Sequence, residues 1–387
     1  MSGCLIMISN IIPKLFNNSN LLQFRQEQLA IFTQKGKPTK KVEEWKYTSL
    51  FNLDLENIVL STKLEKPENN LNGKFYILLS DEIEFNLPKG VTLTKLDAKN
   101  YLLLNKDKNP ESIQALNMSL AQYGFILNIN EDIKEPIYIY EGINNNIAFF
   151  YNEININAKA QIVHICNKSK SAIQTTNVNV KNDAHYQFIA TANSDAFNIN
   201  FLNINQLDDT NMQCDFFLQG SGTNRLTHNH FLNKNSKCEI HNLSFGKGNS
   251  HHDFHSTINH VGSNSSSKEY AKSLVNDSAF CIFKGSVVVD ETVENIKSDQ
   301  LSKNILLSEK SKIVTQPCLL IDQNDIECNH GATTSSLDKE ALFFLQARGI
   351  GIKEAKKMLI TSFIDEKINR SLSKQIQSFL SGKLFDE

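Results

Sequence analysis

Short runs in which apolar and polar residues alternate recur through the middle of the chain, and they restrict its fold more than any other feature. Isoleucines alternate with asparagines in residues 154–157, and the same period of two returns in residues 177–180 and 197–200. A period of two is typical of strands with one buried face. Because these runs recur roughly every two dozen residues, they predict the stacked rungs of a β-solenoid.

Two other folds compete with the solenoid. A doubly wound α/β fold does not fit, because residues from about 110 to 330 lack the amphipathic helices that would separate its strands. A β-sandwich would produce much the same alternation, since its strands also bury one face. Periodicity alone therefore leaves a sandwich and a solenoid open.

Both ends of the chain are predicted to be helical. An imperfect helical stripe covers residues 21–32 near the start. In the tail, Asp338 is a suitable N-cap, and Gly349 stands where a helix end needs a left-handed residue. Two more helices are expected at about residues 353–369 and 372–380. One role for such a tail is to cap the open end of a solenoid.

The composition narrows the class of protein. With 387 residues, a hydrophobic fraction of 40% and a net charge of -2, the chain fits an ordinary globular protein rather than a nucleic-acid binder that depends on high positive charge. No apolar run reaches the roughly 20 residues of a membrane helix, and the apolar start lacks the basic region and cleavage site of a signal peptide. The seven cysteines form no Cys-x-x-Cys pair. They indicate reduced thiols, so we expect a cytoplasmic location.

A thiol and an imidazole stand two residues apart in the run Glu327-Cys328-Asn329-His330. If this run is a strand, Cys328 and His330 point to the same face, with Cα atoms roughly 6.5 Å apart. Thiolate and imidazole can both bind iron-sulfur clusters, but a cluster needs about four ligands. The remaining ligands would then come from a partner chain. The alternative interpretation is that Cys328 is a small buried hydrophobe and His330 a surface residue.

Three segments of the chain resemble one known family. Residues 327–350 (ECNHGATTSSLDKEALFFLQARGI) resemble the C-terminal signature of the SufD branch of the SufB/SufD family of iron-sulfur cluster assembly proteins. Residues 41–48 (KVEEWKYT) look like the N-terminal hallmark of that branch, and residues 268–308 resemble its late core. The SufB branch fits less well, because its members carry an acidic, His-containing run where this chain reads Cys-Asn-His-Gly-Ala-Thr.

The resemblance implies a mainly β fold, with a right-handed parallel β-helix between an N-terminal mixed or helical region and a C-terminal helical domain. We place these parts at residues 1–105, 106–333 and 334–387. The resemblance also implies a non-catalytic scaffold subunit of a SUF complex. Its expected partners are a SufB-like subunit, bound through the β-helix and the region of Cys328 and His330, and a SufC-like ATPase, bound through the C-terminal helices. A homodimer is an alternative for the isolated chain.

By the same resemblance, His330 contributes to a transient Fe-S cluster at the interface with SufB, which supplies thiolate. Cys328 lines that interface and is a second candidate ligand. Glu327 and Asn329 depart from the family pattern around this cysteine. On a strand both would point away from the ligand face, although a nearby carboxylate would raise the pKa of the thiol.

Two enzymatic interpretations stay open beside the scaffold. His251, Asp253 and His255 would share one face of a strand and could bind zinc in a hydrolase, but no His-Glu-x-x-His motif adds a general base. For these residues and His260 we favour a hydrogen-bonded polar ladder on the solenoid. A β-helix enzyme acting on polysaccharides would need a cleft of carboxylates and basic residues. Because the chain has no Gly-x-x-x-x-Gly-Lys-Ser/Thr loop, we expect it to bind no nucleotide and assign ATP hydrolysis to the partner.

Overall fold

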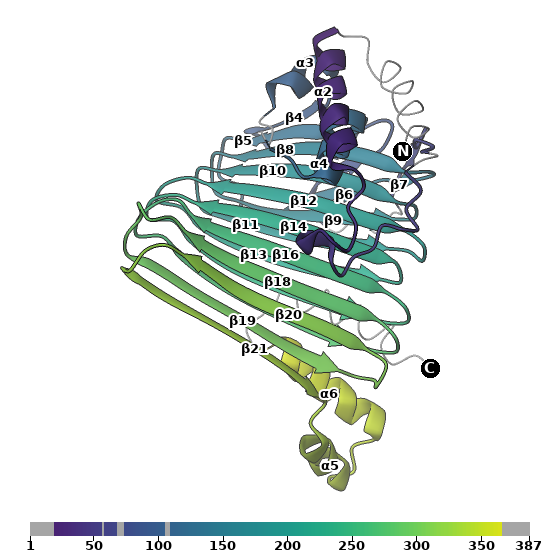
Figure 1. Ribbon diagram of the computed structural model, residues 1–387, viewed down its shortest axis with the longest axis vertical. Coiled ribbons are helices and arrows are strands. Elements are labelled where there is room, and N and C mark those ends of the chain that lie inside the picture. The colour runs from purple at the N-terminus through teal and green to yellow at the C-terminus, as the bar shows by residue number, and fades with distance from the viewer. Residues whose placement is uncertain (1–18, 56–57, 68–72, 105–108, 366–387) are drawn as a thin grey trace.

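The computed structural model describes residues 19–55, 58–67, 73–104 and 109–365. Two long sheets stack into a β-solenoid of about eight rungs, and each rung gives one strand to each sheet (Figure 1). Helices lie at the two ends of this stack (Figure 1). The mainly β solenoid expected from the sequence is confirmed.

From residue 125 onward, the strands of the two long sheets alternate in chain order. The nine-stranded sheet contains β4 (Val91–Lys95), β5 (Phe125–Ile129), β8 (Ala148–Ile156), β10 (Ala172–Val180), β12 (Phe197–Gln206), β14 (Thr223–Leu232), β16 (His251–His260), β18 (Phe280–Val289) and β20 (Lys312–Ile321). The ten-stranded sheet contains β3 (Glu84–Asn86), β2 (Phe75–Leu79), β6 (Ile137–Glu141), β9 (Ala160–Lys168), β11 (Ala184–Ala192), β13 (Asn211–Gly220), β15 (Lys237–Gly246), β17 (Ser266–Val275), β19 (Ile296–Leu306) and β21 (Ile326–Ser336). A small third sheet pairs β1 (Leu64–Glu65) with β7 (Ile143–Asn144). The helices are α2 (Ser19–Lys35), η1 (Glu43–Trp45), α3 (Ala98–Leu103), α4 (Ser112–Leu120), α5 (Lys339–Ala347) and α6 (Ile352–Asp365).

Neighbouring strands run parallel from β5 to β20 in one sheet and from β6 to β21 in the other. Ala148 pairs with Ala172, 24 residues later, and Ala172 pairs with Asn198, 26 residues later. The rungs lengthen toward the C-terminal end, where Phe280 pairs with Lys312. Parallel pairing between successive rungs distinguishes the solenoid from an antiparallel sandwich. It also explains the recurring alternation, because each rung repeats the same inward and outward positions.

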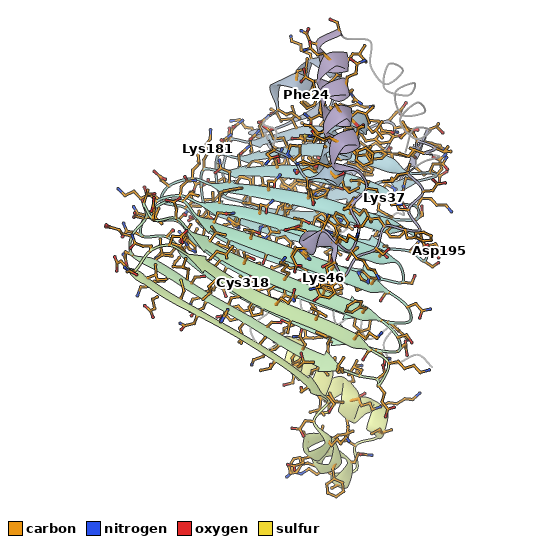
Figure 2. The ribbon with its side chains drawn as sticks, viewed as in Figure 1. Phe24, Lys37, Lys46, Lys181, Asp195 and Cys318 are labelled. Atoms are coloured by element: carbon orange, nitrogen blue, oxygen red, sulfur yellow. The ribbon has the colours of Figure 1, made fainter. Side chains whose placement is uncertain are left out.

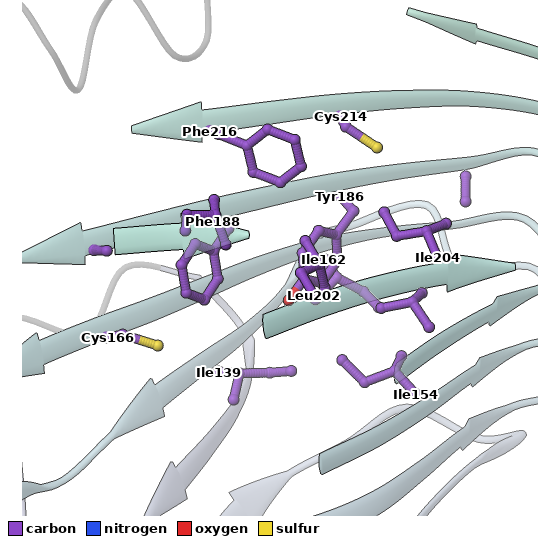
Figure 3. Packing of buried hydrophobic residues seen from close by; sticks show 14 of the residues in the cluster. Ile139, Ile154, Ile162, Cys166, Tyr186, Phe188, Leu202, Ile204, Cys214 and Phe216 are labelled. Atoms are coloured by element: carbon purple, nitrogen blue, oxygen red, sulfur yellow. The ribbon is translucent and has the colours of Figure 1, made fainter. Parts of the chain in front are cut away.

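The inward positions form a continuous apolar core between the two sheets. Phe188 pairs with Phe216 on the next rung, and Ile162 pairs with Tyr186, so similar side chains stack along the solenoid (Figure 3). All four are buried. Burial of each such side chain contributes about 1.5–3 kcal/mol, and the contribution repeats from rung to rung.

Asparagines also stack, on the outer face of the nine-stranded sheet. Asn203 Nδ2 donates to Asn177 Oδ1 at 3.0 Å, and Asn229 Nδ2 donates to Asn203 Oδ1 at 3.0 Å. A second row joins Asn179 to Asn155 at 2.8 Å. Each amide both donates and accepts, so a row of identical side chains satisfies its own hydrogen bonds. The many asparagines of the chain therefore have a structural use that the sequence alone did not reveal.

Asparagine and aspartate also form the corners between the sheets. Asp209, Asn235, Asn264 and Asn295 all have positive φ angles. These two residue types tolerate the left-handed conformation better than other non-glycine residues. Asn235 Nδ2 donates to Asp209 Oδ1 at 2.7 Å, and Asn295 Nδ2 donates to Asn264 Oδ1 at 2.7 Å, so the corners hold one another in register.

The N-terminal helices cover the first rungs. The predicted helix at residues 21–32 is confirmed as α2, whose buried Arg25 donates to the Ser119 carbonyl oxygen of α4 at 2.8 Å. Asn117 of α4 in turn donates to the Phe150 carbonyl oxygen at 3.0 Å, which attaches the helix pair to the nine-stranded sheet. These helices cover the outer face of the nine-stranded sheet over β8, β10 and β12.

The C-terminal helix α6 packs on the outer face of the other sheet. Ile360 and Ile364 join a buried cluster with Phe217, Leu243 and Phe245 from β13 and β15. The predicted second tail helix is thus confirmed as far as the described residues reach. The third, expected at residues 372–380, lies outside them.

The last rung, β20 with β21, differs from the rungs before it. Every residue of β20 and β21 is half-buried or exposed, whereas β16 buries most of its residues. Each of the two strands stands at the end of its sheet. Within the described part of the chain, the C-terminal end of the solenoid is therefore open.

A buried ion pair near the first rungs should contribute strongly to stability. Lys168 Nζ lies 2.6 Å from Glu141 Oε2, and both side chains are fully buried. We expect Lys168→Met to lower the free energy of unfolding by about 3–5 kcal/mol, because it leaves a buried carboxylate without its cation. The measurement is urea unfolding at pH 7.

The matched control is Lys159→Met. Lys159 pairs with Asp183 at 3.5 Å, but both side chains are largely exposed. Because exposed pairs contribute about 0–1 kcal/mol, this variant should unfold close to wild type. Equal effects of the two substitutions would contradict the prediction.

Candidate functional site

Cys328 and His330 lie on β21, the open edge of the ten-stranded sheet. Cys328 pairs with Ser298 and His330 pairs with Gln300 on β19. Ser298 and Gln300 are buried inside the solenoid, so their partners on β21 face the same way, into its open end. The prediction that Cys328 and His330 share one face of a strand is confirmed. Cys328 is half-buried there, and His330 is exposed.

The two residues that flank Cys328 point to the opposite face, as predicted. Glu327 Oε2 accepts from Lys297 Nζ at 2.9 Å, and Asn329 Nδ2 donates to Asp299 Oδ1 at 3.0 Å. Partial burial raises the pKa of the Cys328 thiol, the charge of Asp299 raises it further, and the Ser298 backbone partly offsets both. The carboxylate that raises the pKa of Cys328 is therefore Asp299 on the neighbouring rung, not Glu327.

Two buried polar residues lie behind His330 along the stack. Gln300 pairs with His330 on one side and with Glu269 of β17 on the other. Gln300 Nε2 donates to Glu269 Oε2 at 2.7 Å. Burial raises the pKa of Glu269 to about 7, although the Gln300 hydrogen bond lowers it somewhat. Sequence reasoning missed both residues, because 31 positions separate them along the chain and only the register brings them together.

The histidine-rich run forms the polar ladder that we favoured. His251, Asp253 and His255 all lie on the outer face of β16, where His255 Nε2 is 2.9 Å from Asp253 Oδ1. Asp253 also forms an ion pair with the buried Arg225 and accepts a hydrogen bond from the Thr48 hydroxyl. Burial alone would raise the pKa of Asp253, but Arg225 lowers it below its ordinary value. Its carboxylate is thus already neutralised and hydrogen-bonded without a metal.

His260, at the end of the same strand, is separate from this group. It lies inside the solenoid, where its ring bonds to Ser265 at 2.7 Å and Ser267 at 3.0 Å. The histidine-rich run therefore places His251 and His255 on the outer face of β16 and His260 inside the solenoid.

The segment at residues 41–48 is held on this ladder. The Trp45 indole N–H donates to Glu111 Oε2 at 2.9 Å, and the Arg225 guanidinium lies 4.1 Å from the centre of the Trp45 ring. Thr48 adds its bonds to Asp253 and to His251, the latter at 2.8 Å. Figure 2 shows Lys46 of this segment in front of the nine-stranded sheet. Trp45 is almost fully buried and anchors this segment on the solenoid.

Glu141, His164 and Cys166 bring three metal-ligand atoms within 4.8 Å of one another inside the solenoid. Among the described residues this is the grouping with the closest resemblance to a metal site. However, Glu141 bonds His164 Nε2 at 2.8 Å and pairs with Lys168, while His164 Nδ1 bonds the Tyr186 hydroxyl at 2.8 Å. Although burial raises the pKa of Glu141, Lys168 and His164 lower it to about 2. Lys168 already supplies the positive charge that a metal would bring.

The tail beyond the open rung begins as predicted. Asp338 caps α5, accepting from the backbone N–H groups of Glu340 at 2.9 Å and Ala341 at 3.0 Å. Gly349 has a φ angle of +84°, the left-handed conformation expected after the helix. No described helix is both long enough and apolar enough to span a membrane. The cysteines that the structure describes are all unpaired thiols.

Comparison with known proteins gives a consistent result. Residues 149–363 match the family described as the SUF system FeS cluster assembly SufBD core domain. The chain is 25% identical to the iron-sulfur cluster assembly protein SufD of Escherichia coli, across 88% of this chain and 87% of that protein. It is 29% identical to SufD of Bacillus subtilis, across 36% of this chain and 33% of that protein. It is 24% identical to SufD of Plasmodium berghei, across 78% of this chain and 21% of that protein. The matched core includes Cys328 and His330.

The raised pKa of Glu269 predicts a specific pH dependence of stability. Between its ordinary pKa of 4.5 and the folded value of about 7, the folded chain keeps a proton that the unfolded chain has lost. Stability should therefore fall by about 3 kcal/mol as pH rises through this window and stay low above it.

Glu269→Gln should remove this part of the pH dependence, because an amide does not titrate. The measurement is urea unfolding of both proteins at several pH values from 4.5 to 8. An identical slope for the variant and wild type would show that Glu269 titrates normally.

Proposed function

The chain belongs to the SufBD core-domain family of the SUF iron-sulfur cluster assembly system, and we propose that it acts there as a non-catalytic scaffold subunit sharing a nascent cluster with a SufB-like partner. It is a SufD-like component of that system. The observation that carries the finer proposal is the open last rung, where Cys328 and His330 face the same way on an edge strand.

The chemistry of the two side chains suits a cluster as cargo. An iron-sulfur cluster takes thiolates and, at some positions, imidazole, so one or two ligands from this chain leave the others to a partner. The raised pKa keeps Cys328 protonated until iron displaces the proton. His330 is the more exposed of the two. We therefore assign His330 as the ligand and Cys328 as a residue lining the interface that can join it.

The edges of the last rung supply the surface for the SufB-like subunit. The outer edges of β20 and β21 have no strand beside them in the described structure. Unpaired strand edges bind other strands by continuing the sheet. A second solenoid docked here would extend both sheets and enclose Cys328 and His330, and in its absence a second copy of this chain could use the same edges. Cluster loading then requires this interface to open, which is the role we assign to the ATPase.

The helical tail supplies the surface for a SufC-like ATPase. Phe343 and Phe344 of α5 are 73% and 53% exposed, and α5 buries none of its residues. Exposed neighbouring aromatic side chains are typical of protein interfaces. A cavity of about 370 Å³ between the tail and the solenoid adds a basic surface, lined by Lys247, Lys339, Lys353 and Lys356. An acidic and apolar patch on the partner would complement this region.

The first test removes the proposed ligand. In the complex reconstituted without oxygen with SufB-like and SufC-like subunits, we expect His330→Ala to lower the bound iron and sulfide several-fold, because the cluster loses a ligand. Asn329→Ala is the control, since Asn329 is adjacent but faces outward. Wild-type iron and sulfide in a fully assembled His330→Ala complex would remove His330 from the site.

The second test concerns the ATPase. Phe343→Asp should weaken its association by tenfold or more, measured by calorimetry, because a charge replaces an aromatic anchor. Phe51→Asp is the control, because Phe51 is 88% exposed on the N-terminal segment and lies outside the tail. Unchanged affinity for Phe343→Asp would exclude α5 from the docking surface.

A further inference from the structure

Two buried polar residues lie inside the solenoid directly behind His330. The positions in register are His330 on β21, Gln300 on β19 and Glu269 on β17, followed by the apolar Ile240 on β15. Gln300 and Glu269 are buried. Burying polar groups is unfavourable unless they form hydrogen bonds, so this short file of polar residues needs a reason.

The absence of a side chain at Gly285 makes room for the Gln300 side chain. Gly285 lies beside it on β18, and a Cβ atom at that position would stand 2.3 Å from Gln300 Nε2. Gln300 Nε2 donates to Glu269 Oε2 at 2.7 Å, which turns the amide oxygen the other way. Among the residues that the structure describes, no donor bonds Gln300 Oε1, although this atom is buried. The amide therefore presents an unused acceptor beside the strand that carries His330.

We propose that Gln300 is a positioning residue for His330, with Oε1 accepting a hydrogen bond from the imidazole N–H while Glu269 fixes the amide. This inference rests on the proposed function, in which His330 binds the nascent cluster. A histidine that binds metal through one ring nitrogen commonly donates its other N–H to a protein acceptor, which fixes the tautomer and the ring orientation. Directly paired residues on adjacent strands have Cβ atoms about 5 Å apart, within reach of such a bond. Docking of a partner on the open rung would remove the competing water.

A second buried amide on β19, that of Asn304, differs from Gln300 in its neighbour on β21. Asn304 also faces inward on β19, is buried, and has an unbonded oxygen, Oδ1. Its partner on β21 is Thr334, which has no ring to orient. Asn304 is therefore a control on the same face of the same strand, with a different neighbour on β21.

The experiment uses cobalt(II) as an optical probe, titrated into the cluster-free complex with SufB-like and SufC-like subunits. Gln300→Met keeps the side-chain length but removes the acceptor, and we expect cobalt binding to weaken about tenfold or more. Asn304→Leu should bind cobalt as wild type does. Wild-type cobalt affinity in an assembled Gln300→Met complex would overturn the proposal.

A double-substitution cycle separates positioning from a general structural effect. If Gln300 acts through His330, Gln300→Met should cause no further loss in a His330→Ala background, whereas an independent structural effect would add to it. Additive losses therefore overturn the proposal. If His330→Ala alone leaves cobalt binding unchanged, the proposed function fails, and that result is distinct from a failure confined to Gln300.

Variants of Glu269 decide the question if Gln300→Met does not assemble. Glu269→Gln keeps an acceptor for the Gln300 amide and should retain cobalt affinity, whereas Glu269→Leu should lose it. Equal affinities for the two variants in assembled complexes would overturn the role of Glu269 in holding the amide.

Discussion

The whole structure depends on the parallel backbone ladder that keeps successive rungs in register. Each residue of β10 pairs with residues 24 positions before and 26 positions after it, so equivalent positions stack along the solenoid. Because equivalent positions stack, the inward apolar residues form a continuous core. For the same reason, asparagines form rows on the outer face, and the corner residues of successive rungs bond one another. A polar residue that is buried on either face therefore needs a partner on a neighbouring rung or on a covering segment.

The buried charges follow this rule. The Glu141 carboxylate pairs with Lys168 and His164 on the neighbouring strand. The Asp253 carboxylate pairs with Arg225 on the neighbouring strand and with Thr48 of the covering segment. These groups stabilise the solenoid and its N-terminal cover, and the carboxylates of Glu141 and Asp253 are already occupied by cations and hydrogen-bond donors. The family's N-terminal hallmark thus has a structural explanation here, because its Trp45 anchors that segment on the ladder.

At the open end of the solenoid, the inward residues of the last rung have no following rung to pack against in the described structure. Cys328 and His330 occupy inward positions, but no further rung covers them in the described structure. Side chains that would be core residues in the middle of the solenoid become accessible at its end. A fold that stabilises itself by adding rungs is therefore suited to sharing a site with a second solenoid, and the polar pair behind His330 is consistent with a site prepared for a charged cargo.

Much of this could be predicted from sequence, because it depends on local patterns. The alternation predicted one-sided strands, Asp338 and Gly349 predicted the limits of α5, and the spacing of Cys328 and His330 placed both on one face. Periodicity could not choose between a sandwich and a solenoid, since both bury one strand face. Nor could it reveal Gln300, Glu269 or Asp299 beside the site, because rung lengths vary from 24 to 32 residues and set which distant residues meet. Only the tertiary register decides those contacts, since it depends on the length of every turn between strands.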